Sequence, residues 1–195
     1  SPQIEEIMGI IMEEKVPVVF TSAGNPKTWT SKLKEAGIKV VHVVSSSKFA
    51  LKSVEAGVDA IVAEGFEAGG HNGREETTTL TLIPQVRKAV DIPLIAAGGI
   101  SSGESMAAVF AMGAEGVQVG TRFALTEESS ASDEFKQKCI TLNEGDTIVS
   151  LKKLTPVRLI KNDFYQQVKE MEDSGSSTEE LRELLGRGRS KKGIF

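Results

Sequence analysis

One histidine between glycines is the residue in this sequence best suited to proton chemistry. His71 lies in Glu67-Ala68-Gly69-Gly70-His71-Asn72-Gly73, shortly after an apolar run that ends at Glu64. An imidazole exchanges protons near neutral pH, as a general acid or base must. The surrounding glycines let the backbone bend sharply around the ring. A surface histidine without a role is the alternative, but the position after an apolar run favours catalysis by His71.

Two other segments could bind an anion through backbone amides. The segment Ile95-Ala96-Ala97-Gly98-Gly99-Ile100-Ser101-Ser102 leads into a helical pattern, and Gln118-Val119-Gly120-Thr121 ends the next apolar run. Exposed N–H groups and the positive end of a helix dipole attract negatively charged groups. The glycines of either segment alone could merely permit tight turns. Together, at the ends of successive runs, the two segments predict one phosphate site.

The sequence leaves the roles of Glu64 and of residues 73–90 open, and it counts against two other sites. Glu64 either accepts a hydrogen bond from a ligand or bonds nearby backbone amides. Residues 73–90, which include Glu75-Glu76-Thr77-Thr78-Thr79, form either a lid or an exposed polar loop. His42 lies inside an apolar run, which predicts a buried, hydrogen-bonded structural residue. No cysteine or histidine pair has metal-ligand spacing, so we predict no metal site.

A repeated unit of strand and helix would position these residues. Up to about Phe123, each apolar, β-branched run precedes a segment with helical periodicity. Continuous apolar runs are typical of parallel strands buried on both faces, and right-handed crossovers place the helices outside. The predicted strands are residues 17–20, 40–44, 60–64, 93–97 and 116–119.

Glycines mark the ends of three predicted connecting helices. Residues 27–36, 47–56 and 102–112 precede Gly37, Gly57 and Gly113 respectively. This pattern predicts an α/β protein but does not by itself separate a barrel from an open doubly wound sheet. In both architectures, ligands bind beyond the carboxyl ends of the parallel strands. We therefore expect the candidate residues to lie at one edge of the sheet.

The pattern changes after residue 126. Residues 127–140, 155–173 and 178–185 each predict a helix, the last with Thr178 as N-cap and Gly186 as its stop. We expect residues 1–126 to form part of a barrel and residues 127–195 a helical extension.

The composition excludes several classes of protein. The 195 residues are 39% hydrophobic and 26% charged, as in ordinary globular proteins. The net charge of −4 does not favour nucleic-acid or membrane binding. The single cysteine, Cys139, rules out an internal disulfide framework and fits the reducing cytoplasm. No apolar run reaches transmembrane length and no export signal begins the sequence, so we expect a cytoplasmic protein.

Three motifs taken in order resemble the nitronate monooxygenases (formerly 2-nitropropane dioxygenases) and their relatives, the FabK-type enoyl-ACP reductases. They are Ala63-Glu64-Gly65-Phe66-Glu67-Ala68-Gly69-Gly70-His71, Ile95-Ala96-Ala97-Gly98-Gly99-Ile100, and Gly113-Ala114-Glu115-Gly116-Val117-Gln118-Val119-Gly120-Thr121-Arg122-Phe123. The resemblance covers nearly all of the chain. It implies a TIM-type (β/α) barrel, with about five of eight βα units and a helical C-terminal extension here. The family's three earlier units precede the loop to which Ser1 corresponds, so these strands alone should form an open arc.

The resemblance also implies an FMN cofactor. It places the flavin phosphate at Gly98–Gly99 and Gln118–Thr121, and His71 beside the reactive face of the flavin as the catalytic residue. The implied cofactor-binding residues are Ser22, Glu64, Gly69, Gly70, Gly98, Gly99, Gln118, Gly120 and Thr121.

Two activities follow from the resemblance. Nitronate monooxygenases oxidise alkyl nitronates with O₂, whereas FabK-type enzymes pass a hydride from NAD(P)H through FMN to an enoyl thioester. Glu76-Thr77-Thr78-Thr79, Pro156-Val157-Arg158 and Lys161-Asn162 are closer to the FabK-type branch, without fixing the substrate. The expected partners are a small-molecule substrate or an acyl-carrier-protein thioester, and a second copy of the chain in a homodimer.

Two other interpretations of the phosphate site remain. One is a non-catalytic barrel module that binds a phosphate ligand without redox chemistry. The other is a flavin-free isomerase or aldolase. An aldolase that forms a Schiff base needs a lysine at a strand end, and none of the five predicted ends has one.

Overall fold

The computed structural model describes residues 2–185, and its main sheet contains five parallel strands. They are β1 (Val18–Thr21), β2 (Lys39–Val44), β3 (Ala60–Glu64), β5 (Leu94–Ala97) and β6 (Gly116–Gln118). The strands neighbour one another in sequence order, β1-β2-β3-β5-β6, and every pair is parallel. This order confirms the barrel-type arrangement and excludes the doubly wound one. Each strand lies within one residue of its predicted bounds.

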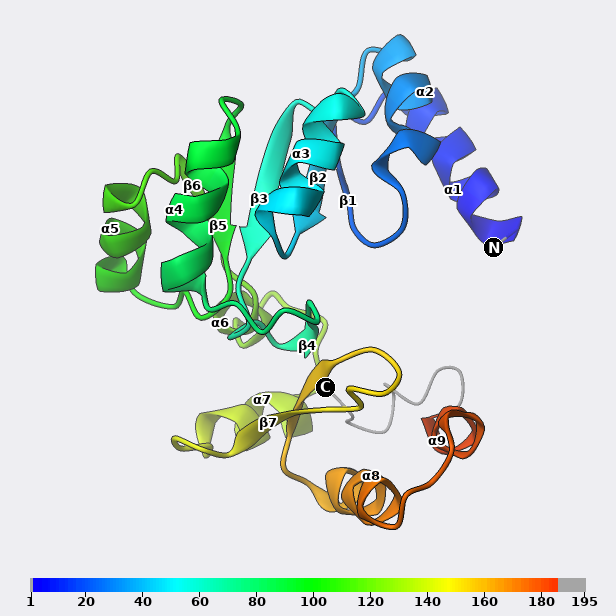
Figure 1. The fold of residues 1–195 in the computed structure, drawn as a ribbon, viewed down its shortest axis with the longest axis vertical. Helices are drawn as coiled ribbons and strands as arrows, with labels where there is room; N and C mark the ends of the chain where they lie inside the picture. The colour runs from blue at the N-terminus through cyan, green and yellow to red at the C-terminus, as the bar shows by residue number, and fades with distance from the viewer. Residues whose placement is uncertain (1, 186–195) are drawn as a thin grey trace.

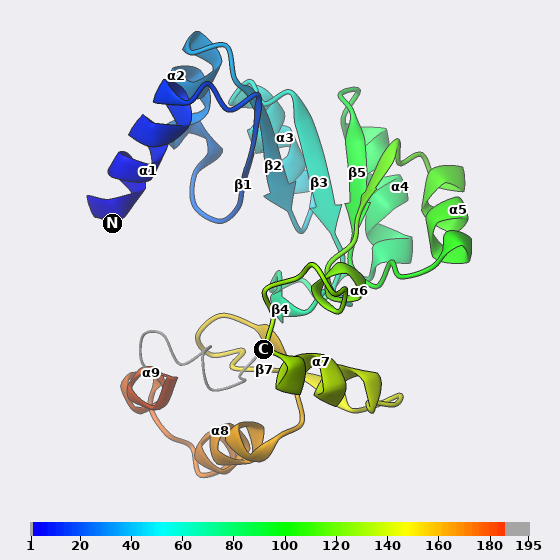
Figure 2. The same cartoon turned by 180° about the vertical axis from the view of Figure 1, so that it is seen from behind.

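Helices cover the outer face of this sheet, as the crossover rule predicts. They are α1 (Pro2–Glu13), the 3₁₀ helix η1 (Pro26–Thr28), α2 (Thr30–Glu35), α3 (Ser47–Glu55), α4 (Thr79–Ala89) and α5 (Gly103–Ala111). Figure 1 shows α3 and α4 in front of the strands, and Figure 2 shows them behind. The main core lies between the two layers and includes Leu33, Val40, Ile61 and Ile83, all fully buried. A smaller cluster of Val41, Val62 and Ala97 faces the inside of the open arc.

The local sequence explains where several helices end, and it also explains a helix, α1, that was not predicted. Gly37, Gly57 and Gly113 follow their helices with positive φ, which confirms their predicted role as stops. Helix α1 was not predicted. Its Met8 is buried and Ile11 packs on the core, so the spacing of three residues indicates a helix where a loop was expected.

The segment after residue 126 contains strands that were not expected. It comprises α7 (Asp133–Ile140), β7 (Thr147–Ser150), β8 (Val157–Ile160), α8 (Asp163–Asp173) and α9 (Thr178–Leu185), and it follows the short α6 (Thr121–Ala124). β8 pairs antiparallel with β7 and with the two-residue strand β4 (Gly70–His71). In Figures 1 and 2 this segment lies beyond the carboxyl ends of the main strands.

Two predicted helix starts and one predicted N-cap in this segment were wrong, whereas α9 has its predicted bounds. A helix over 155–173 was expected, but Pro156 disfavours helical geometry at Thr155, and Asn162 caps α8 through Tyr165 N. The helix expected over 127–140 begins only after Ser132, whose side chain caps it. Ser177, rather than Thr178, caps α9, because Ser177 Oγ accepts from Glu180 N. The predicted stop at Gly186 and the rest of the extension lie outside the described residues, and the domain boundary stays a prediction.

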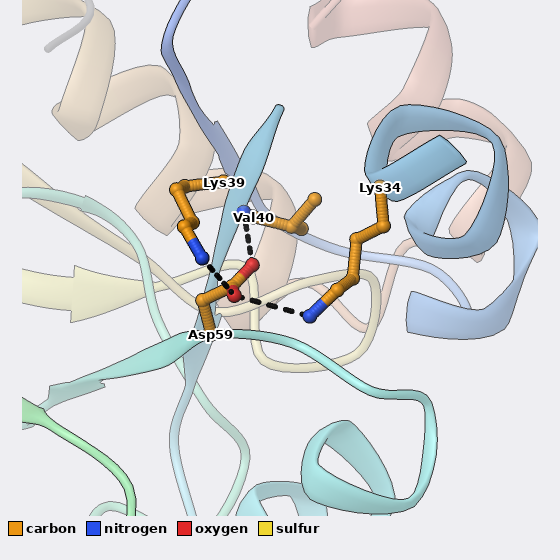
Figure 3. Close-up of polar contacts among 4 residues, drawn as sticks. All are labelled: Lys34, Lys39, Val40 and Asp59. Carbon is orange, nitrogen blue, oxygen red and sulfur yellow. Dashed lines mark hydrogen bonds and ion pairs between the residues drawn. The ribbon is translucent and has the colours of Figure 1, made fainter. Parts of the chain in front are cut away.

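The amino ends of the strands carry a charge cluster centred on Asp59 (Figure 3). Asp59 Oδ2 accepts a hydrogen bond from Val40 N at 2.9 Å, while Oδ1 accepts from Lys34 Nζ at 3.0 Å and Lys39 Nζ at 3.2 Å. Burial alone would raise the pKa of this carboxyl, but the three donors together lower it. The cluster therefore ties α2 and β2 to the start of β3.

Candidate active site

A cavity of about 690 Å³ lies at the carboxyl ends of β1, β2 and β3. Three residues of the predicted site line it: Ser22 after β1, Glu64 at the end of β3, and His71 in β4. Segments far apart in the sequence therefore contribute to one cavity. Other lining residues include Lys27, His42, Phe49, Lys52, Asn72 and Thr155.

Glu64 has the features of a ligand-binding carboxyl group. It is half-buried, and burial raises its pKa above the ordinary value. Within residues 2–185 its side chain has no hydrogen-bond or ion-pair partner, so it does not bond nearby backbone amides there. A carboxyl in this state accepts a hydrogen bond when ionised and donates one when protonated.

The backbone around His71 is held on both sides. His71 pairs with Val157 across β4 and β8, and Asn72 N donates to Pro156 O at 2.8 Å. Asn72 Nδ2 also donates to Ala68 O at 2.8 Å, which closes the turn that precedes His71. The His71 side chain is exposed and borders the cavity. The expected loop at this position is thus a short strand.

His42 is buried and hydrogen-bonded, as predicted from its place inside an apolar run. Its side chain is 5% exposed, and Nδ1 lies 2.7 Å from Thr21 Oγ1. Burial lowers its pKa, which favours the neutral ring. The ring also lines the cavity, which no pattern in the sequence indicated.

The predicted phosphate site lies along the same edge, beyond the cavity lining. Gly98 and Gly99 follow β5 with φ of 97° and 69°. A Cβ at Gly98 would lie 2.7 Å from Gly65 O, so the close backbone approach requires glycine there. Among the described residues, no acceptor is bonded to the backbone N–H of Gly99 or Gly120. Both N–H groups are therefore available to an anion.

The remaining predicted residues belong to this second region. A Cβ at Gly69 would lie 3.8 Å from Thr121 Oγ1, so the loops after β3 and β6 are adjacent. The β5–β6 register pairs Ala97 with Gln118, which places the ends of these two strands side by side. The residues that do not line the cavity are Gly69, Gly70, Gly98, Gly99, Gln118, Gly120 and Thr121.

Glu67 and Thr79 hold the two regions together and were missed as site residues. Thr79 N donates to Glu67 Oε2 at 2.9 Å, which places a carboxylate at the start of α4. Thr79 Oγ1 lies 3.0 Å from the same oxygen and 2.8 Å from Gly98 O. Thr79 itself begins an apolar periodic segment after two other threonines. That helix-start signal was available in a segment interpreted only as a lid or loop.

Residues 2–185 contain neither a candidate metal site nor a candidate membrane-spanning helix. Over residues 2–185, histidine, cysteine and acidic side chains form no group of three that could hold a metal ion. Within the same range, no helix combines the length and apolar character needed to cross a membrane.

Comparisons with known proteins agree with one another. A family model described as nitronate monooxygenase matches residues 3–191. A probable nitronate monooxygenase from Staphylococcus saprophyticus is 37% identical over 183 residues, covering 88% of this chain and 51% of that protein.

Two solved structures are similar to the chain over nearly its whole length. FabK from Thermotoga maritima matches with a TM-score of 0.91 and 42% identity, covering 100% of this chain and 61% of that one. A nitroalkane oxidase from Streptomyces ansochromogenes matches with a TM-score of 0.76 and 30% identity, covering 95% and 57%. The chain thus spans between 51% and 61% of these three proteins.

Proposed function

The chain belongs to the nitronate monooxygenase family, and on that premise we propose that the protein is an FMN-dependent oxidoreductase with His71 as its catalytic residue. One observation carries the proposal. An unpartnered carboxyl, Glu64, and an exposed histidine, His71, border one cavity at the carboxyl ends of parallel strands. In barrel enzymes that face carries the active site, whereas the amino-end face serves stability.

The chemistry of the residues fits FMN. The unbonded N–H groups of Gly99 and Gly120 would receive the phosphate, with Gln118 and Thr121 at the same strand end. Glu64 would accept a hydrogen bond from the ring system or the ribityl chain. When bound, FMN supplies two-electron oxidation and reduction.

His71 would then act on the substrate as a proton donor or acceptor. An imidazole at the cavity rim can serve as a general acid or base toward a bound substrate. For an enoyl thioester, His71 would donate a proton to the substrate carbon next to the carbonyl. For a nitroalkane, it would remove the proton from the carbon that bears the nitro group.

We propose an enoyl thioester as the substrate, with NAD(P)H as the electron donor. The similarity to FabK supports this choice, because it exceeds the similarity to the nitroalkane oxidase in both TM-score and identity. Nitronate oxidation with O₂ is the second candidate. It is supported by the 37% identity to a probable nitronate monooxygenase.

Anaerobic reduction of the flavin distinguishes these candidates. NADPH or NADH is added to the complete purified protein, followed by crotonyl-CoA, while the visible absorbance of the flavin is recorded. Loss of the absorbance with NAD(P)H and its return with crotonyl-CoA is the expected result. Loss of the flavin absorbance with ethyl nitronate but not with NAD(P)H would support nitronate oxidation, the second candidate. No change with any of these reagents would contradict both.

A further inference from the structure

Arg158 connects the C-terminal segment (residues 127–185) to the loop that carries His71. Its backbone lies opposite Gly70 in the β4–β8 pair, next to the pairing of Val157 with His71. Its side chain donates to Phe66 O from Nη2 at 2.9 Å and from Nε at 3.3 Å. Arg158 therefore contacts both the beginning and the end of the turn over residues 66–71.

The guanidinium group is held by contacts on several sides. It lies 5.0 Å from the centroid of the Phe66 ring, close enough for a cation–π interaction. Nη1 also donates to Thr147 Oγ1 at 3.2 Å, which links the group to β7. These contacts fix the half-buried side chain in one orientation.

No carboxylate among residues 2–185 forms an ion pair with Arg158. Phe66 O and Thr147 Oγ1 are its side-chain hydrogen-bond acceptors instead. A half-buried cation without an acidic partner contributes little to stability through charge pairing. A planar guanidinium instead offers two donors in fixed geometry to one carbonyl, which a lysine cannot do.

From this geometry we infer that Arg158 is a positioning residue, which sets the location of His71 by holding the turn over residues 66–71 against β8. The inference rests on the proposed catalytic role of His71. Arg158 does not line the cavity, so it acts through the loop rather than on the substrate. Displacement of a catalytic group by about 1 Å can lower turnover roughly 100-fold.

A double-mutant cycle in the complete flavin-loaded protein tests this inference. Turnover is measured for wild type, Arg158→Ala, His71→Ala and the double variant. We expect Arg158→Ala to lower kcat roughly 10- to 100-fold, with a smaller change in KM and unchanged flavin content. In the His71→Ala background, removal of Arg158 should change kcat by less than about 2-fold, because its effect passes through His71.

Two further variants control the experiment. Arg158→Lys keeps the charge and the stem but loses the paired donors, so its kcat should lie between those of wild type and Arg158→Ala. It also replaces Arg158→Ala in the cycle should the alanine variant fail to fold. Arg182→Ala removes an exposed arginine of α9 that pairs with Glu179, and should leave turnover unchanged.

The outcomes separate this inference from the proposed function. Equal losses from Arg158→Ala in both backgrounds, or no loss in either, would overturn the positioning role and leave the function standing. An Arg158→Lys variant as impaired as the alanine variant in both backgrounds would also overturn it. Normal turnover in His71→Ala would overturn the catalytic role of His71, and the inference about Arg158 with it.

Discussion

Two carboxyl groups at opposite ends of β3 lie in different environments, which shift their pKa values in opposite directions. Asp59, just before the strand, has a lowered pKa because three donors outweigh the effect of its burial. Glu64, at the last position of the strand, has a raised pKa because it is buried without donors. The paired carboxyl lies on the amino-end face and the unpartnered one in the cavity. This distribution agrees with the division of barrel faces into stability and activity.

Asp59→Asn should destabilise the protein by about 1–3 kcal/mol at neutral pH, because it weakens the bonds to Val40 N and two lysines. A lowered folded-state pKa contributes stability above the unfolded pKa of about 3.9, and that contribution is lost as the pH falls through the folded pKa. The difference from wild type in urea unfolding should therefore shrink in acid. A difference that is constant down to the most acidic folded conditions would contradict this assignment.

His71→Ala should lower turnover of the complete enzyme by roughly 10²–10⁴-fold, the usual contribution of a positioned acid or base. Flavin content and thermal midpoint should barely change, because the side chain is exposed and its removal leaves no core cavity. Steady-state kinetics, flavin absorbance and a thermal melt test the three parts separately. Near-normal turnover would show that His71 is not catalytic. Unfolding or loss of flavin would show that its role is structural.

At the scale of elements, the sequence pattern predicted the parallel strands but not the pairing of distant segments. The five parallel strands were predicted because their continuous β-branched runs and glycine stops are encoded within each unit. The pairing of β4 with β8 was not, because it joins residues 70–71 to residues 157–158 and leaves no periodic signal in either segment. Val157–Ile160 was assigned to a helix that in fact begins only at Asp163.

Three residues of the predicted site lie together in the structure. Glu64 and His71 were named because an apolar run ends at or before them, and Ser22 was named because the resemblance implied it. All three line one cavity. The part played by Glu67 depends on its contact with Thr79, twelve residues away, and no spacing rule indicates that contact. His42 likewise lines the cavity because of how the neighbouring strands are arranged, which the sequence pattern does not indicate.

The loop after β5 gives a prediction at this scale. Gly99→Glu should remove flavin from the complete enzyme, because it adds negative charge at the proposed phosphate site. Gly99→Ala is the matched control: it imposes the same positive φ on a side chain, and its Cβ would lie 3.0 Å from Glu67 Cβ. The alanine variant carries the same backbone strain without the negative charge, so it should keep more flavin than Gly99→Glu. Unchanged flavin content in Gly99→Glu would contradict the assignment, and equal loss in both variants would attribute it to backbone strain.

At the scale of the whole molecule, the cavity lies where the main sheet meets the C-terminal segment. Thr155, from the loop before β8, lines it together with residues that follow β1, β2 and β3. Arg74 and Arg158 donate to carbonyls across the same junction, from opposite sides. Figure 1 shows the C-terminal segment beyond the strand ends, so both parts of the chain shape the site.

All of the proposed chemistry requires that FMN binds at this edge of the sheet. The direct test is the visible absorbance spectrum of the complete purified protein, followed by mass spectrometry of the cofactor released on denaturation. We predict a yellow protein that releases FMN at about one molecule per chain. A colourless protein that takes up no FMN when it is supplied would contradict the proposed function and favour a phosphate-binding module without redox chemistry.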